Sequence, residues 1–131
     1  MFFRTLGVRR DTASYIEGVF LSNIRMQSNF LGNSSIVLAY SKAKTTCNFD
    51  LYQSIGDWAL WSNSMFSNLE YQDVYKTLGR LSYYSCYSLL RKEWILYEEL
   101  ADDLPRIIER LKRVDVCSLL APKIPSINTF T

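Results

Sequence analysis

Histidine is absent from this chain of 131 residues. Its absence removes the commonest general base and the commonest zinc ligand, and with them any Ser-His or Cys-His nucleophile pair. The sequence also lacks a GxSxG motif, a Gly-rich phosphate loop and a GxGxxG fingerprint. We therefore expect a protein that is not an enzyme and that uses no cofactor.

Cysteines are few, the net charge is small, and long apolar runs are absent. The three cysteines, Cys47, Cys86 and Cys117, are far apart, which excludes a CxxC pair and predicts free, mostly buried thiols. A net charge of +2 gives no broad attraction for nucleic acid or anionic lipid. The first residues lack the pattern of a secretory signal and no run of about 18 apolar residues occurs, so we expect neither a signal peptide nor a membrane span. We expect a cytoplasmic protein, or one within a particle assembled in the cytoplasm.

Helix breakers are rare as well, because proline occurs only at positions 105, 122 and 125 and glycine only five times. Apolar residues three and four apart predict helices over about 11–30, 33–44, 48–66 and 70–90. The second of these is also compatible with a strand, since residues 35–40 are continuous and partly β-branched. Residues 93–115 form either one kinked helix or two. Asp11 is the expected cap of the first helix, and Asn48 or Asp50 opens the third.

These elements predict an all-α fold. We expect a single-domain bundle of five or six helices over residues 1–116, joined by short connections. An extended, proline-containing tail follows over residues 117–131.

Glycines within two of the predicted helices suggest a close helix crossing. An internal glycine costs up to about 1 kcal/mol relative to alanine, and Gly56 and Gly79 could face each other where two helices meet. Asp57 and Arg80 each follow one of these glycines, and we expect them to form an ion pair between the helices. A ligand lying against exposed backbone at these glycines is the alternative.

The same region contains two short motifs, Gly-Asp-Trp-Ala-Leu at 56–60 and Gly-Arg-Leu-Ser-Tyr at 79–83. They resemble a pattern in small uncharacterised helical bacterial proteins, in which a Gly-Asp-x-x-Leu helix precedes a Gly-x-x-x-Tyr helix. The resemblance covers about residues 50–114. It implies helix packing and no particular activity.

Aromatic residues are abundant, at 15% of the chain, and such residues are enriched at protein interfaces. The fourth predicted helix has an apolar stripe with Val74 and Leu81 and a second stripe of tyrosines, so we expect it to be buried on more than one side. The apolar residues at both ends of the sequence are expected to dock on a neighbouring subunit, packing on the same bundle being the alternative. The expected interface residues are Phe2, Phe3, Tyr71, Tyr75, Tyr83, Tyr87, Ile124, Ile127 and Phe130.

These features predict a non-enzymatic assembly or adaptor protein that binds copies of itself or other proteins, a virion component being one concrete version. A small-ligand-binding protein with a pocket near Gly56, Asp57 and Gly79 is one alternative. A nucleic-acid-associated accessory protein is another. Its candidate contacts are Arg4, Arg9, Arg10, Arg106, Arg110 and Arg113. A cation site on Glu98, Asp102 and Asp103 is not favoured, because acidic residues before Pro105 are explained by helix capping.

Overall fold

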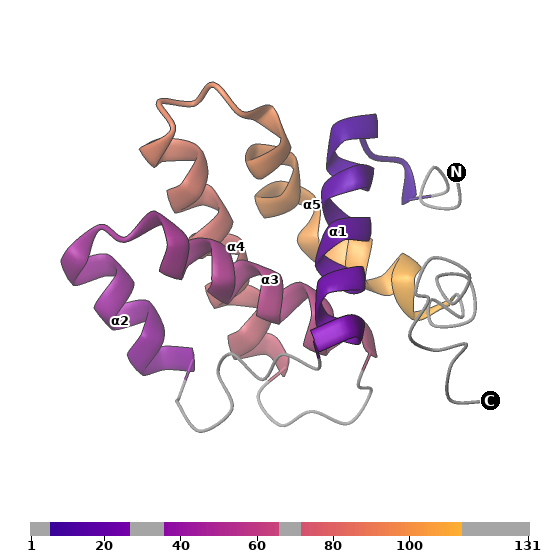
Figure 1. Ribbon diagram of the computed structural model, residues 1–131, viewed down its shortest axis with the longest axis horizontal. Coiled ribbons are helices and arrows are strands. Elements are labelled where there is room, and N and C mark those ends of the chain that lie inside the picture. The colour runs from indigo at the N-terminus through magenta and orange to yellow at the C-terminus, as the bar shows by residue number, and fades with distance from the viewer. Residues whose placement is uncertain (1–5, 27–35, 66–71, 114–131) are drawn as a thin grey trace.

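The computed structural model describes residues 6–26, 36–65 and 72–113, and within these ranges the chain forms helices and no strand (Figure 1). The helices are α1 (Arg10–Met26), α2 (Ile36–Thr46), α3 (Phe49–Met65), α4 (Gln72–Leu89) and α5 (Ile95–Lys112). The prediction of an all-α fold is confirmed. The second segment, for which a strand was the alternative, is helical.

Residues 95–112 form one helix, which resolves the choice between one and two helices, and Pro105 lies inside it. The expected extension of the first helix to residue 30 lies outside the described residues. So do the boundary at 116–117 and the tail that follows it.

The breaks between helices have local causes. Cys47 adopts a positive φ of 50° and ends α2, and Asn48 N–H then donates to the carbonyl of Ala43 at 3.1 Å. The side chain of Asn48 accepts from the N–H of Leu51 at 3.2 Å, so Asn48, and not Asp50, caps α3. Arg91 and Lys92 end α4 in the same way, with φ of 58° and 60°.

Asp11 is not the cap that we expected. The helix begins at Arg10, which places Asp11 in its first turn. Its carboxylate accepts from the N–H of Thr12 at 3.0 Å and from Arg9 Nε at 3.2 Å. The N–H of Arg9 donates to Glu99 at 3.0 Å, so a carboxylate of α5 binds the start of α1 instead.

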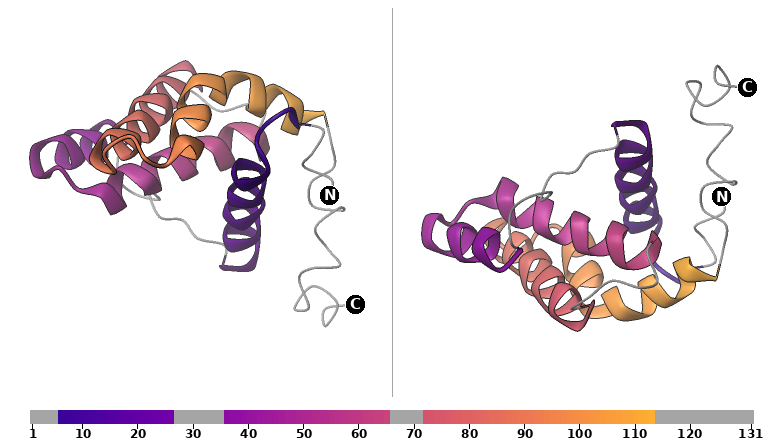
Figure 2. Two further views of the ribbon diagram at one scale, coloured as in Figure 1. Left: turned by 90° about the horizontal axis from the view of Figure 1, so that it is seen from above. Right: turned by 90° about the horizontal axis from the view of Figure 1, so that it is seen from below.

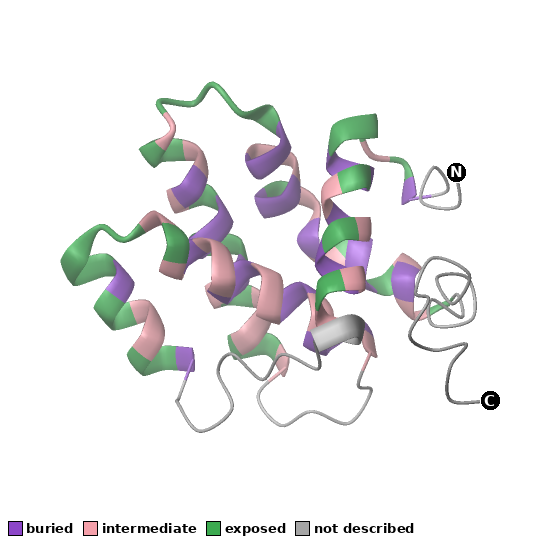
Figure 3. Ribbon diagram, viewed as in Figure 1, coloured by how far each residue is buried: buried purple, intermediate pink, exposed green. Residues whose placement is uncertain are grey.

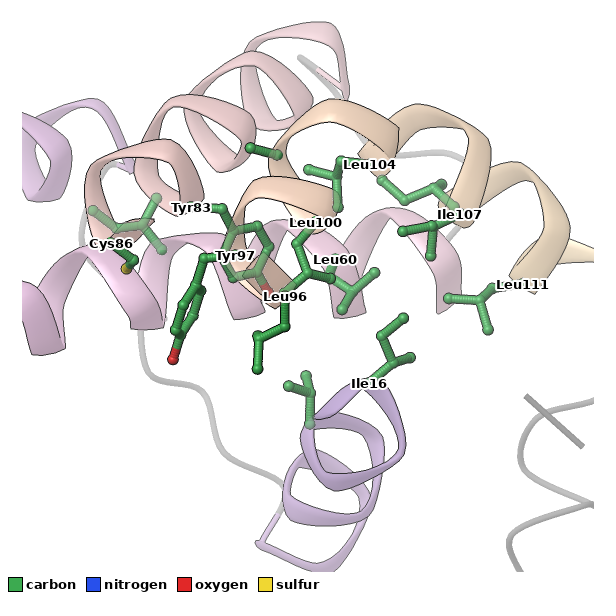
Figure 4. Packing of buried hydrophobic residues seen from close by; sticks show 14 of the residues in the cluster. Ile16, Leu60, Tyr83, Cys86, Leu96, Tyr97, Leu100, Leu104, Ile107 and Leu111 are labelled. Carbon is green, nitrogen blue, oxygen red and sulfur yellow. The ribbon is translucent and has the colours of Figure 1, made fainter. Parts of the chain in front are cut away.

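Helix α4 has the central position, since its most extensive contacts are with α3 and α5, while α2 packs on α3 and α4. Figure 2 shows α1 standing to one side of the other four helices, where it contacts α3 and α5. The core lies between the helices, on the sides that face one another (Figure 3). Its largest fully buried side chains are Leu6, Ile16, Phe20, Ile55, Leu60, Tyr83, Leu100, Leu104, Ile107, Ile108 and Leu111, and several of them are drawn in Figure 4.

The close crossing of α3 and α4 depends on glycines, as predicted, but the two glycines do not face each other. A Cβ added at Gly56 would lie 2.6 Å from Cε1 of Tyr83, and one added at Gly79 would lie 2.6 Å from Cβ of Ala59. Each glycine therefore accommodates a side chain of the opposite helix. Because residue 56 meets 83 and residue 59 meets 79, the two helices run antiparallel.

This crossing can be tested with Gly79→Ala. We expect the free energy of unfolding in urea to fall by about 1–2 kcal/mol, because overpacking against Ala59 and Leu104 outweighs the better helix propensity of alanine. Gly18→Ala is the matched control, since its added Cβ meets nothing within 4 Å beyond the adjacent residues and the backbone of its own helix. It is expected to stabilise the protein by about 0.5–1 kcal/mol. Equal effects at the two positions would contradict this account.

Candidate functional site

A partly buried, hydrogen-bonded cluster of two tyrosines and a carboxylate joins three helices. Tyr15 on α1 and Tyr83 on α4 both donate to Oδ1 of Asp57 on α3, at 2.6 Å and 2.7 Å. Tyr97 on α5 packs against both tyrosine rings, with centroids 5.6 Å and 6.2 Å away. Gln53 Nε2 donates to the Tyr97 hydroxyl at 2.7 Å. One carboxylate thus connects α1, α3 and α4 at a single oxygen atom.

Burial sets the electrostatics of this cluster. Desolvation raises the pKa of Asp57 to about 6, although hydrogen bonds from Tyr15 and Tyr83 act to lower it. Burial, and next the negative charge of Asp57, raise the pKa of both Tyr15 and Tyr83, so both remain protonated donors. Asp57 lines neither of the two surface clefts described below. The arrangement serves to connect helices, and we assign no reaction to it.

The expected ion pair between Asp57 and Arg80 is wrong, because these residues bind different partners. Asp57 accepts from tyrosines, while Arg80 Nε donates to the carbonyl of Ala101 at 2.9 Å. Pro105 has no N–H to donate to that carbonyl four residues earlier. Arg80 thus supplies from α4 the hydrogen bond that Pro105 cannot supply within α5. An internal proline, which leaves a carbonyl needing a donor, was the available sequence signal for this role.

The surface above this hydrogen bond is hollowed. A cleft of about 350 Å³ between α4 and α5 is lined by Thr77, Arg80, Leu81, Tyr84, Ala101 and Asp102. Gly56 and Gly79, beside which the alternative pocket was expected, are both buried against other side chains, so neither exposes its backbone to a ligand. The cleft instead adjoins the solvent-facing side of α4.

That side of α4 carries large apolar residues. Val74, Leu81 and Tyr84 are 40%, 45% and 48% exposed. Leu89, at the end of the helix, is also exposed, as are Trp94 and Ile95 at the start of α5. We use the name outer face of α4 for the five positions Val74, Thr77, Leu81, Tyr84 and Ser88.

The tyrosines expected at an interface occupy different environments. Tyr83 is fully buried in the core, so its assignment to an interface is wrong. Tyr75 and Tyr87 are partly buried, and desolvation together with the neighbouring Glu98 raises the pKa of Tyr87. Tyr84, which the two predicted stripes leave out, is the exposed tyrosine of α4. The remaining expected interface residues, Phe2, Phe3, Tyr71, Ile124, Ile127 and Phe130, lie outside the described residues.

Three basic residues of the nucleic-acid alternative bind partners within the described ranges. Arg9 pairs with Asp11 at 3.2 Å and Arg106 with Asp103 at 2.7 Å, and Arg110 donates to the carbonyl of Leu6. Arg10 and Arg113 are exposed, and Arg4 lies outside the described residues. Arg9 and Arg10 line a second hollow of about 700 Å³ together with Asp11 and Ser14.

The cysteine expectation holds for one described thiol. Cys86 is free and buried, and burial raises its pKa to about 12, whereas Cys47 is free and exposed. In the part of the chain that is described, no group of three or more Cys, His, Asp or Glu side chains is placed to hold a metal ion. None of the helices formed by the described residues has the length and apolar character needed to cross a membrane.

Comparisons with known proteins add no family assignment. No protein-family model matches the chain, and no significant match is found among curated proteins or solved structures. The resemblance of residues 50–114 to small helical bacterial proteins therefore stays a prediction.

The raised pKa of Asp57 predicts a specific dependence of stability on pH. Between its ordinary pKa of 3.8 and about 6, the folded protein holds a proton that the unfolded chain has released. The contribution of Asp57 to stability therefore falls as pH rises through this window, by at most about 1.4 kcal/mol per pH unit.

Asp57→Asn keeps an oxygen acceptor for both tyrosines and does not titrate. We expect its free energy of unfolding in urea, relative to the wild type, to rise between pH 4 and pH 6. Asp73→Asn, at an exposed carboxyl of α4, controls for the loss of one negative charge. A difference between Asp57→Asn and wild type that does not change with pH would show that Asp57 is not desolvated.

The role of Arg80 predicts coupling to Pro105. Arg80→Met should destabilise the wild type by about 1–3 kcal/mol, because the carbonyl of Ala101 loses its donor. In a Pro105→Ala background the helix supplies an N–H to that carbonyl, so the same substitution should cost less. A double-mutant cycle by urea denaturation is expected to give a coupling energy of about 1 kcal/mol. Additive effects would refute the assignment.

Proposed function

We propose that this chain is a non-enzymatic assembly protein that binds another protein subunit through the outer face of α4. The observation that carries the proposal is the row of half-exposed apolar side chains at Val74, Leu81 and Tyr84. These residues lie on the side of α4 opposite Tyr83 and Cys86, which are buried in the core.

The energetics favour a protein partner for this row. Complete burial of a large apolar side chain contributes about 1.5–3 kcal/mol, so covering the exposed half of each of these three residues contributes roughly 1 kcal/mol apiece. Contiguous apolar surface bordered by polar residues is typical of protein–protein contact sites. The cleft beside Leu81 and Tyr84 offers a partner side chain a place to enter between α4 and α5.

The aromatic content supports the same proposal. Tyr84 combines a large apolar ring with a hydroxyl group. This combination suits a surface that is exposed to solvent in the free protein and buried in the complex. It forms a ring pair with Tyr87, with centroids 6.2 Å apart, so part of its orientation is already fixed before binding.

Native mass spectrometry of the untagged protein, purified gently from its own source, tests this proposal. We expect the wild type in a defined oligomer or complex, and Leu81→Ser/Tyr84→Ser as a monomer, because the variant lacks the apolar contacts. Leu38→Ser is the matched control, since Leu38 is 69% exposed on α2, and it should assemble like the wild type. Recovery of the wild type as a bare monomer would overturn the proposal.

A further inference from the structure

We infer that the partner of the outer face of α4 is a second copy of this chain, paired through α4 in antiparallel orientation about a twofold axis. This inference rests on the proposed function and adds the identity and geometry of the partner. Three features of α4 and α5 support it: the spacing of the outer face, the charges along its edge, and the position of Leu81 and Tyr84.

The spacing of the outer face fits a helix as the partner. Its positions 74, 77, 81, 84 and 88 are separated by three and four residues in alternation, which is the a and d spacing of a coiled-coil seam. Such a seam is straight along the helix and accepts the side chains of a second helix as knobs. The contacts of α4 with α3 and α5 already use its other sides, so this seam faces outward.

The charges beside the seam favour a copy of the same surface. Arg80 is adjacent to Leu81, and its Nε donates to the carbonyl of Ala101, while its guanidinium forms no ion pair with a described residue. Asp102 lines the same cleft, and its carboxylate takes part in none of the ion pairs among the described residues. A surface that carries both signs on one edge is complementary to itself after a twofold rotation.

An antiparallel pairing fits the spacing of the outer face and the charges along its edge. With the axis near residues 82 and 83, Leu81 of each copy packs against Tyr84 of the other, which forms the apolar centre. The side of α4 that borders α5 lies on the same side of the helix pair in both copies. Arg80 of each copy then faces the acidic edge of the other, which carries Glu98 and Asp102. Arg80 thus donates a hydrogen bond to the carbonyl of Ala101, for which Pro105 has no N–H, and also presents a positive charge to the partner.

Analytical ultracentrifugation of the purified full chain over a wide concentration range tests the pairing. We expect a monomer–dimer equilibrium for the wild type. The dissociation constant should rise at least about tenfold in Leu81→Ser/Tyr84→Ser and remain unchanged in Leu38→Ser. Circular dichroism and urea denaturation check that each variant is folded.

A charge exchange tests the geometry. Arg80→Glu places like charges opposite Asp102 in a homodimer, and Asp102→Lys does the same opposite Arg80, so each variant alone should dimerise at least about tenfold more weakly than wild type. Mixed together, the two variants restore opposite charges at both ends of the interface and should form a heterodimer. Arg80→Met loses the bond to Ala101 without gaining a negative charge. Mixed with Asp102→Lys it restores opposite charges at only one end of the interface, so it should recover dimerisation less than Arg80→Glu does.

The possible outcomes separate the inference from the proposed function. A purified chain that stays monomeric at every concentration overturns the self-pairing. So does a dimer that the outer-face and charge variants leave intact. If the purified chain is monomeric but a complex from its source is lost in Leu81→Ser/Tyr84→Ser, the partner is a different protein and the proposed function stands.

Discussion

The packing of Tyr83 against Gly56 is the contact on which the rest of this structure depends. The absence of a Cβ at residue 56 lets the tyrosine ring lie directly on the backbone of α3. From that position the Tyr83 hydroxyl reaches the carboxylate of Asp57, which also binds Tyr15. A single side chain of α4 therefore fixes its crossing with α3 and takes part in the cluster that holds α1. A burial cost at the Asp57 carboxylate is the consequence, and two hydrogen bonds offset only part of it.

The orientation of Tyr83 also determines which residues of α4 remain outside. Side chains of a helix about 180° apart cannot share one environment, so burial of Tyr83 and Cys86 directs Leu81 and Tyr84 toward solvent. The same rotation places Arg80 at the border with α5, beside the carbonyl that Pro105 leaves without a donor. Core packing and the properties of the proposed interface therefore have one origin, which is the rotation of α4 about its axis.

Much of the fold follows from local sequence, because helix formation depends on residues three and four apart. The absence of breakers and the apolar periodicity were enough to predict helices near the observed α1–α5, and Asn48 carried a cap signal that the structure uses. The glycine signal was also informative: it correctly indicated a close crossing of two helices. The opposing residues, Tyr83 and Ala59, depend on the register between two helices, which no local pattern encodes.

The sequence by itself determined the helical class and the exclusion of histidine-dependent chemistry, since these depend on composition and on near neighbours. Only the tertiary structure decided which of the two stripes of α4 is buried, because both are apolar enough to form a core. It likewise decided that Asp57 binds tyrosines and that Arg80 binds a backbone carbonyl. Partner choice among polar side chains is settled by distance in the folded chain, and sequence adjacency to a glycine does not reveal it.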